Sequence, residues 1–200
     1  MAMEANEVRV AGYGHVFVAD EGTTMPTDLD TPMASADWTD LGYVTTDGVA
    51  FTFSRETEDL DAWQGDKIRV LTMKEPKTAA FTLMQTDQST IETAFGGGVW
   101  DDTAGVGKYT PPAKGENKIR ALVVEYDDGA DIKYRYCFPR TQVEGDVEFT
   151  LNREGAVEYP ITMGVLENVP VYNILTNDPA IVTTSAASVS AQRASAPKSE

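Results

Sequence analysis

The sequence contains one cysteine, one histidine and few basic residues, and each shortage excludes a class of protein. Cys137 has no second cysteine to pair with, so the fold cannot depend on an intrachain disulfide. His15 alone cannot supply the several imidazoles of most histidine-based metal sites. With 16 Lys and Arg against 32 Asp and Glu, the net charge of −16 disfavours binding to nucleic acid or to an anionic membrane surface.

Long hydrophobic runs are also missing, since every run is far shorter than the roughly 20 residues of a membrane span. Residues 1–6 lack the basic and apolar regions of a signal peptide, so we expect a protein that is used without Sec-type export. The 200 residues, 42% of them hydrophobic, are enough for one domain with a core. We expect this domain at 1–175 and a flexible tail or arm, rich in Ser, Ala and Thr, at 176–200.

Apolar residues recur at every second position along much of the chain, which predicts half-buried β-strands. The segments with this pattern are 8–18, 49–53, 132–138, 147–151 and 157–165. Residues 121–124 are apolar on both faces and predict a central strand. Pro160 cannot donate to a β-ladder, which favours an edge position for the last strand.

Two Asp-Gly pairs predict hairpin turns between strands. The pair at 47–48 separates 43–46 from 49–53, and the pair at 128–129 separates 119–126 from 132–138. A helix is predicted from Ser89, where Glu92 completes a capping box, to the glycines at 96–98.

These elements predict a mainly β fold, a β-sandwich or barrel with one short flanking α-helix and long loops at 19–41 and 55–66.

Catalytic and cofactor motifs are absent from the sequence. His15 lies in the middle of a predicted strand, where a Ser-His-Asp triad is not expected, and Gly107-Lys108 lacks the earlier glycine of a phosphate-binding loop. The acidic segment 56–66 departs from an EF-hand loop because Trp63 would occupy a ligand position, although cation binding there stays open. We therefore expect no enzymatic activity, no cofactor and no metal site.

One segment resembles a known family. Residues 51–70 read FTFSRETEDLDAWQGDKIRV, and a further predicted strand at 79–86 and the capped helix follow. In this element order, over about 7–167, and in its Glu…Ala-Trp-Gln-Gly…Arg-Val spacing, the chain resembles the major tail proteins, or tail tube proteins, of long-tailed bacteriophages, particularly those infecting actinobacteria. The Ser/Ala-rich tail is not part of the resemblance.

The resemblance implies a β-sandwich that assembles into rings, usually hexamers, whose inner strands join into a continuous β-barrel. The rings stack into a hollow tube through which the genome leaves the capsid. It also implies other tail proteins as partners, such as the tape measure and tail terminator, and DNA that passes the lumen without specific binding. The expected location is the virion tail, with assembly in the host cytoplasm and no membrane partner.

The long loops at 19–41 and 55–66 are the expected contacts between stacked rings, and we expect 55–66 to become ordered only when the next ring docks. Its Trp63 either folds back on its own domain or anchors in a neighbouring subunit. The residues assigned to this subunit and ring interface are Arg55, Glu56, Glu58, Asp59, Leu60, Asp61, Trp63 and Gln64.

The alternative function is a carbohydrate- or protein-binding β-sandwich module that uses the exposed aromatics Trp38, Trp63 and Trp100. A hydrolase with paired carboxylates is a further alternative, although the 32 acidic residues single out no pair. Rings or tubes at high protein concentration would distinguish the tail protein from a monomeric module.

Overall fold

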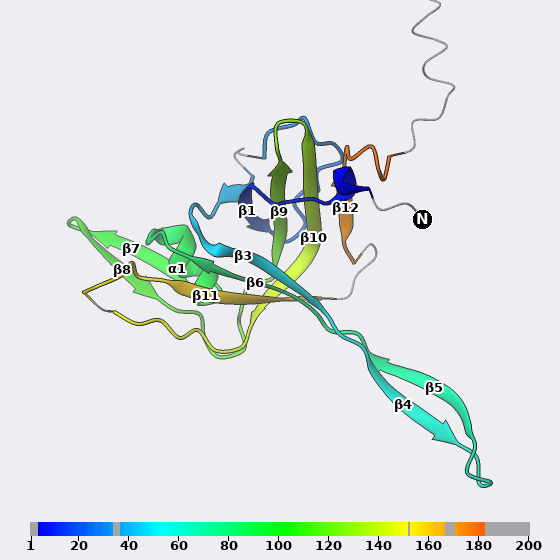
Figure 1. Ribbon diagram of the computed structural model, residues 1–200. Coiled ribbons are helices and arrows are strands. Elements are labelled where there is room, and N and C mark those ends of the chain that lie inside the picture. The colour runs from blue at the N-terminus through cyan, green and yellow to red at the C-terminus, as the bar shows by residue number, and fades with distance from the viewer. Residues whose placement is uncertain (1–3, 34–36, 152, 167–170, 183–200) are drawn as a thin grey trace, which may run out of the picture.

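The computed structural model describes residues 4–33, 37–151, 153–166 and 171–182, and this part of the chain is built mainly from antiparallel strands (Figure 1). The strands are β1 (Tyr13–Asp20), β2 (Thr39–Asp40), β3 (Val44–Phe53), β4 (Glu56–Asp61), β5 (Lys67–Lys74), β6 (Lys77–Leu83), β7 (Val99–Thr103), β8 (Val106–Thr110), β9 (Arg120–Asp128), β10 (Ile132–Glu144), β11 (Tyr159–Val165) and β12 (Asn173–Thr176). The helices are the 3₁₀ turn η1 (Ala5–Glu7) and α1 (Gln88–Ala94), and neither could cross a bilayer. The predicted mainly β fold class is confirmed.

One antiparallel sheet of eight strands forms the body. Neighbouring strands follow the order β2-β1-β9-β10-β11-β6-β3, and β12 pairs with β10. Side chains from β1, β9 and β10 share one core with side chains from β6 and β11, so the curled sheet packs on itself like a sandwich (Figure 1). Two hairpins, β4–β5 and β7–β8, form separate two-stranded sheets, and α1 contacts β11.

The second half of β1 is buried on both faces. Val16 points into the inner core, whereas Phe17 joins a second cluster on the outer face. Met33 and Trp38, from the segment between β1 and β2, cover that outer cluster. The predicted loop 19–41 is therefore packed on its own domain at these positions, and β1 is not simply half-buried.

The prediction of a central strand at 121–124 is confirmed, because β9 lies between β1 and β10 and these four residues are at most 5% exposed. The turn at 128–129 is confirmed as well: Asp128 pairs with Ile132, and Gly129 has a φ of +69°. Cys137 of β10 is fully buried, and burial raises the pKa of its thiol to about 11. It is a packing residue of the sheet.

The predicted hairpin at 47–48 is wrong. Residues 43–46 and 49–53 do not pair with each other; β3 runs through both, and β6 is the partner on each side. Val44 pairs with Leu83 and Val49 with Phe81, so the residues between them form a large bulge. Gly48, with a φ of +70°, provides the left-handed conformation that a turn and a bulge both need.

The predicted edge position of the last strand is also wrong, since β11 lies between β10 and β6. The pairing with β10, however, covers only Thr162 to Val165. Pro160 pairs with Thr82 of β6 and lies beyond the stretch of β11 that pairs with β10. The N–H that proline lacks is therefore not needed for pairing with β10.

Two predicted strand segments lie outside regular structure. Val8 and Val10 are 71% and 65% exposed and precede β1, which begins only at Tyr13. In 147–151 the chain forms no strand, and Leu151 is 73% exposed. Alternation alone did not produce a strand here because the described part of the sheet offers neither segment a neighbouring strand.

The helix cap lies two residues earlier than predicted. Asp87, not Ser89, caps α1, because its side chain accepts a hydrogen bond from the backbone N–H of Thr90 at 2.7 Å. The glycines at 96–98 end the helix. The N–H of Gly97 bonds to the carbonyl of Glu92 at 2.7 Å, and all three glycines have positive φ.

The two ends of the described chain are joined by a buried carboxylate. Both oxygens of Asp178, which is 2% exposed, accept 2.6 Å hydrogen bonds from Arg9, and the hydroxyl of Tyr134 donates to the same group. These bonds, Arg9 first, hold the pKa of Asp178 below its ordinary value. Residues 176–182 of the predicted tail therefore contact the domain, and 183–200 lie outside the described residues.

We expect Asp178→Asn to lower the melting temperature at pH 7, and the difference from the native protein to shrink as the pH falls below about 4. A carboxyl group whose pKa is depressed by folding stabilises the protein above its unfolded-state pKa, and this stabilisation is lost on protonation. Thermal melts from pH 2 to 7 measure it, with the exposed Asp47→Asn as control. A difference of the same size at pH 2 and pH 7 would argue against the ion pair.

Candidate assembly surface

A long β-hairpin projects from the body, and we call residues 54–75 the arm (Figure 1). It continues the ribbon formed by β3 and β6, since the N–H of Ser54 bonds to the carbonyl of Pro76 at 3.0 Å. An exposed ion pair of 2.7 Å between Arg55 and Glu75 closes the junction. The segment predicted as a loop at 55–66 is therefore corrected: it contains β4 and the turn that leads into β5.

Every residue of β4 and β5 is exposed. The register places Leu60 and Leu71 on one face of the ribbon, and Ile68 and Val70 on the other. A two-stranded hairpin without a covered face is marginally stable in water. Apolar side chains on both faces of such a ribbon indicate a surface that a partner covers.

The two strands of the arm carry opposite charge. β4 has four acidic residues and no basic one, whereas β5 has three basic residues and no acidic one. Only one close ion pair joins them in the described structure, between Asp59 and Lys67 at 2.6 Å. The free edge of β4 therefore repels another β4 edge and attracts a basic surface.

Trp63 occupies the turn at the tip of the arm. The turn is closed by a 2.8 Å hydrogen bond from the N–H of Ala62 to the carbonyl of Asp66, and Gly65 has a φ of +89°. The Trp63 side chain is 101% exposed, so it does not fold back on its own domain. A fully exposed tryptophan at the end of a projecting hairpin has the character of an interface anchor.

The structure brings the predicted interface residues together on this arm. Arg55 lies at its base, Trp63 and Gln64 lie at its tip, and the other residues lie along the exposed strand β4: Glu56, Glu58, Asp59, Leu60 and Asp61. The sequence prediction missed β5 as the other half of the same surface. The alternation of Ile68 and Val70 with charged residues was the available signal.

Two edges of the main sheet are free within the described residues. β3 ends the sheet and pairs with β6 on one side only. On the opposite edge, β2 pairs with Phe17 and Val18 of β1, and the N–H of Leu41 bonds to the carbonyl of Val16, so Tyr13 to His15 have β9 as their single neighbouring strand among the described residues. Exposed edges of this kind can accept a strand from another chain.

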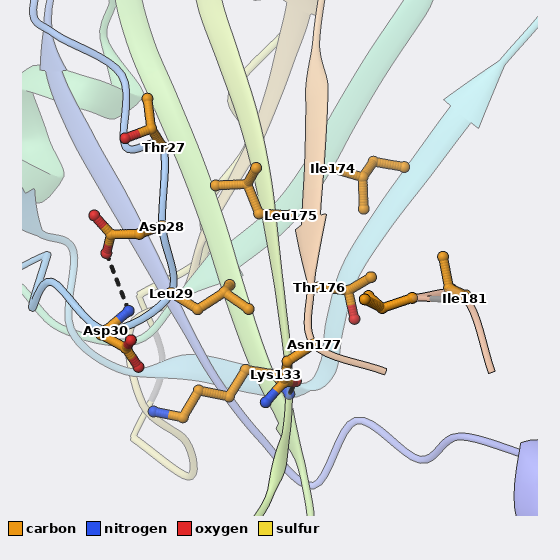
Figure 2. A pocket seen from close by; sticks show the side chains of 11 residues that line it. Thr27, Asp28, Leu29, Asp30, Lys133, Ile174, Leu175, Thr176, Asn177 and Ile181 are labelled. Carbon is orange, nitrogen blue, oxygen red and sulfur yellow. Dashed lines mark hydrogen bonds between the residues drawn. The ribbon is translucent and has the colours of Figure 1, made fainter. Parts of the chain in front are cut away.

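A shallow pocket of about 520 Å³ lies on the body (Figure 2). Its walls come from residues 27–30, from 174–177, from 181–182 and from Lys133 of β10. The Asp28 carboxylate accepts hydrogen bonds from the N–H groups of Thr31 at 2.7 Å and Asp30 at 3.0 Å, which hold its pKa below the ordinary value. The carboxylate of Asp28 thus serves the loop conformation and is not positioned for acid–base chemistry.

A buried arginine of β10 holds the same loop through hydrogen bonds to its backbone carbonyls. Arg135, 1% exposed, donates hydrogen bonds to the carbonyls of Asp28 at 2.6 Å and Thr31 at 3.1 Å. Its guanidinium also pairs with the Glu125 carboxylate at 2.9 Å. Arg135 therefore joins β9, β10 and the loop after β1 into one hydrogen-bonded network. No sequence pattern predicted this network.

Groups for catalysis or metal binding do not converge in the described part of the chain. His15 bonds to Asp40 through Nδ1 at 3.0 Å and stacks on Phe17, which is a structural role on the outer face. Among the described residues, no group of three or more His, Cys, Asp or Glu side chains could hold a metal ion. The arm and the free sheet edges are therefore the candidate functional surfaces of the described chain.

Comparison with known proteins gives one match that covers most of the chain. A family model described as "Phage tail tube protein" matches residues 1–187. Among curated individual proteins, none matches the sequence. The matched range contains the whole body and the whole arm.

Proposed function

Because this chain belongs to the phage tail tube protein family, we propose that its copies form rings that stack into the hollow tail tube. The family is a structural one, and its members are components of the phage tail. The observation that carries the stacked-ring assembly is the arm, whose two strands are exposed along their full length and bear apolar side chains on both faces. Such a surface suits contact with another subunit.

Lateral contacts within a ring would use the free edges of the sheet. Pairing of the β3 edge of one subunit with the β1 edge of the next would satisfy backbone groups that no neighbouring strand pairs among the described residues. Because the two edges differ, the contact is heterologous, and such contacts close into rings or continue as filaments. Six subunits in a ring, and a phage that infects actinobacteria, stay predictions from the family resemblance.

The net charge of −16 suits a conduit for DNA. A cationic wall would bind phosphates with release of counterions, whereas an acidic or neutral wall lets the duplex pass. We propose a non-enzymatic role, in which DNA crosses the lumen without specific binding. The tape measure and tail terminator would be the other tail partners, and assembly would take place in the host cytoplasm.

Electron microscopy of the purified protein over a range of concentrations tests this function. Rings or tubes are expected at high concentration. The binding-module alternative predicts monomers at every concentration, and a chain that stays monomeric also in the presence of other tail proteins would rule out the tube.

Hydrogen exchange should distinguish the arm in the free subunit from the arm in the tube. In the single chain, β4 and β5 have no covered face, so their amides should exchange far faster than those of β9. In the tube, we expect strong protection of the arm and little change in β9. Equal protection of the arm in both states would contradict its role at the contact between rings.

Salt should accelerate assembly. Subunits of equal negative charge repel one another, and at 0.15 M ionic strength the Debye length is only about 8 Å. We expect light scattering to rise faster as NaCl is increased from 10 mM to 150 mM. Slower assembly over this range would indicate that specific ion pairs between the arm and its partner dominate over the net repulsion.

A further inference from the structure

The inner face of the body has an unfilled cleft at one end, between the free edges of β1 and β3. The cleft has a volume of about 570 Å³, and we call it the β1–β3 slot. Its floor is aromatic: Phe51 stacks on Tyr136 with ring centroids 5.0 Å apart, and Tyr136 stacks on Tyr126 at 6.2 Å. Gly14 and Gly48 lie among its lining residues, so part of the wall has no side chain.

The slot contains a hydroxyl group without a partner. Thr45, in the bulge of β3, is one of the residues that line the slot, and its Oγ1 is buried and has no hydrogen-bond partner among the described residues. A buried hydroxyl without a partner costs free energy unless a ligand supplies one. The residues that line the slot thus include flat aromatic rings and a buried hydroxyl that could accept a hydrogen bond.

The same chain carries a side chain with the complementary features. Trp63 has a large aromatic surface that is fully exposed, and its indole N–H is a donor that needs an acceptor when buried. The arm projects away from the body, so Trp63 does not contact the slot of its own chain (Figure 1). The slot and the tip can meet only between two copies.

Charges near the two sites are also complementary. Asp47 lies in the bulge between the slot-lining residues Thr46 and Gly48, and it forms no ion pair or hydrogen bond in the described structure. Arg69 of β5, close to the tip of the arm, is likewise without a partner among the described residues. An arm that entered the slot tip first would bring these two charges to the same rim.

We propose that the β1–β3 slot is the receptor for Trp63 of another copy. The indole extends the aromatic stack over Phe51 and Tyr136, and its N–H donates to Oγ1 of Thr45. This inference rests on the proposed tube function and names the surface that receives the arm. A buried tryptophan covers about 150–250 Å² of the roughly 800 Å² per partner in a stable interface, so the faces of the arm supply the remainder.

Cross-linking between paired cysteines tests the contact. The variant Gln64→Cys/Thr46→Cys keeps Trp63 and carries one thiol at the tip and one at the slot rim. The control Gln64→Cys/Val106→Cys has the second thiol on the exposed β8. Cys137 is buried, so it should not react. With a short thiol–thiol cross-linker, we expect a ladder longer than dimers for the slot pair only.

The outcomes separate the slot from the tube. Native tubes with no ladder for the slot pair, or with an equal ladder for the control, would overturn the slot and leave the tube function standing. If the native protein forms neither rings nor tubes, both proposals fail.

A second measurement isolates the hydrogen bond. Thr45→Val should raise the critical concentration for assembly about fivefold in the native background. In a Trp63→Phe background the same substitution should have no effect, because phenylalanine has no N–H to donate. An equal effect in both backgrounds would show that Thr45 acts on folding of the body and would overturn its contact with Trp63.

Discussion

A subunit without its arm should fold normally and form no tubes. The variant replaces residues 56–74 with Asn-Gly, a two-residue turn that suits a hairpin between Arg55 and Glu75. The junction is already paired through Ser54, Pro76 and the Arg55–Glu75 ion pair, so the shortened ribbon keeps its register. Because no residue of β4 or β5 is buried, we expect the melting temperature to change by only about 2 °C.

Negative-stain microscopy and sedimentation measure the loss of assembly. The Trp63→Ala variant, with the arm intact, should assemble more weakly than the native protein and fold equally well. The arm-less chain should also shorten native tubes when mixed in at low proportion, because it can be added to a growing end but offers no tip to the next ring. Tubes of normal length from the arm-less chain alone would refute the role of the arm.

Removal of the Arg135 guanidinium should produce the largest loss of stability in the body. Arg135→Met leaves the Glu125 carboxylate and the carbonyls of Asp28 and Thr31 without their donor. Loss of one partner of a buried ion pair costs about 3–5 kcal/mol. For a domain of this size, that corresponds to a drop in melting temperature of roughly 6–20 °C.

The matched control is Arg69→Met on the exposed strand β5, which should change stability by less than about 0.5 kcal/mol. Arg135→Lys should lie between the two, because a lysine keeps the charge but cannot donate to two carbonyls and a carboxylate at once. Urea denaturation of the three variants gives the comparison. If Arg135→Met and Arg69→Met had the same midpoint, the buried network would contribute little to stability.

Several elements followed from local patterns. The apolar run at 121–124 predicted a central strand, and the Asp-Gly pair at 128–129 predicted the turn between β9 and β10. The strand prediction was correct because residues 121–124 are buried on both faces. The turn prediction was correct because the two paired strands, β9 and β10, are adjacent in sequence. The short range of these signals explains their success.

Other predictions failed where a distant strand decided the outcome. The pair at 47–48 has the residues of a hairpin turn, but β6 pairs with the chain on both sides of it and turns the same residues into a bulge. The charged residues of β4 indicated a loop, because a sequence cannot show that a ribbon already formed by β3 and β6 extends into solvent. Register and neighbours are properties of the assembled sheet.

The sequence by itself determined the β-rich class, the presence of one short helix near residues 89–96 and the absence of an intrachain disulfide, because composition and alternation are local properties. Only the tertiary structure decided the place of each strand in the sheet, the projection of the arm and the joining of Arg9 to Asp178. Those features depend on contacts between residues far apart in the chain. Such contacts form only when the complete sheet packs around its core, so no local stretch of sequence specifies them.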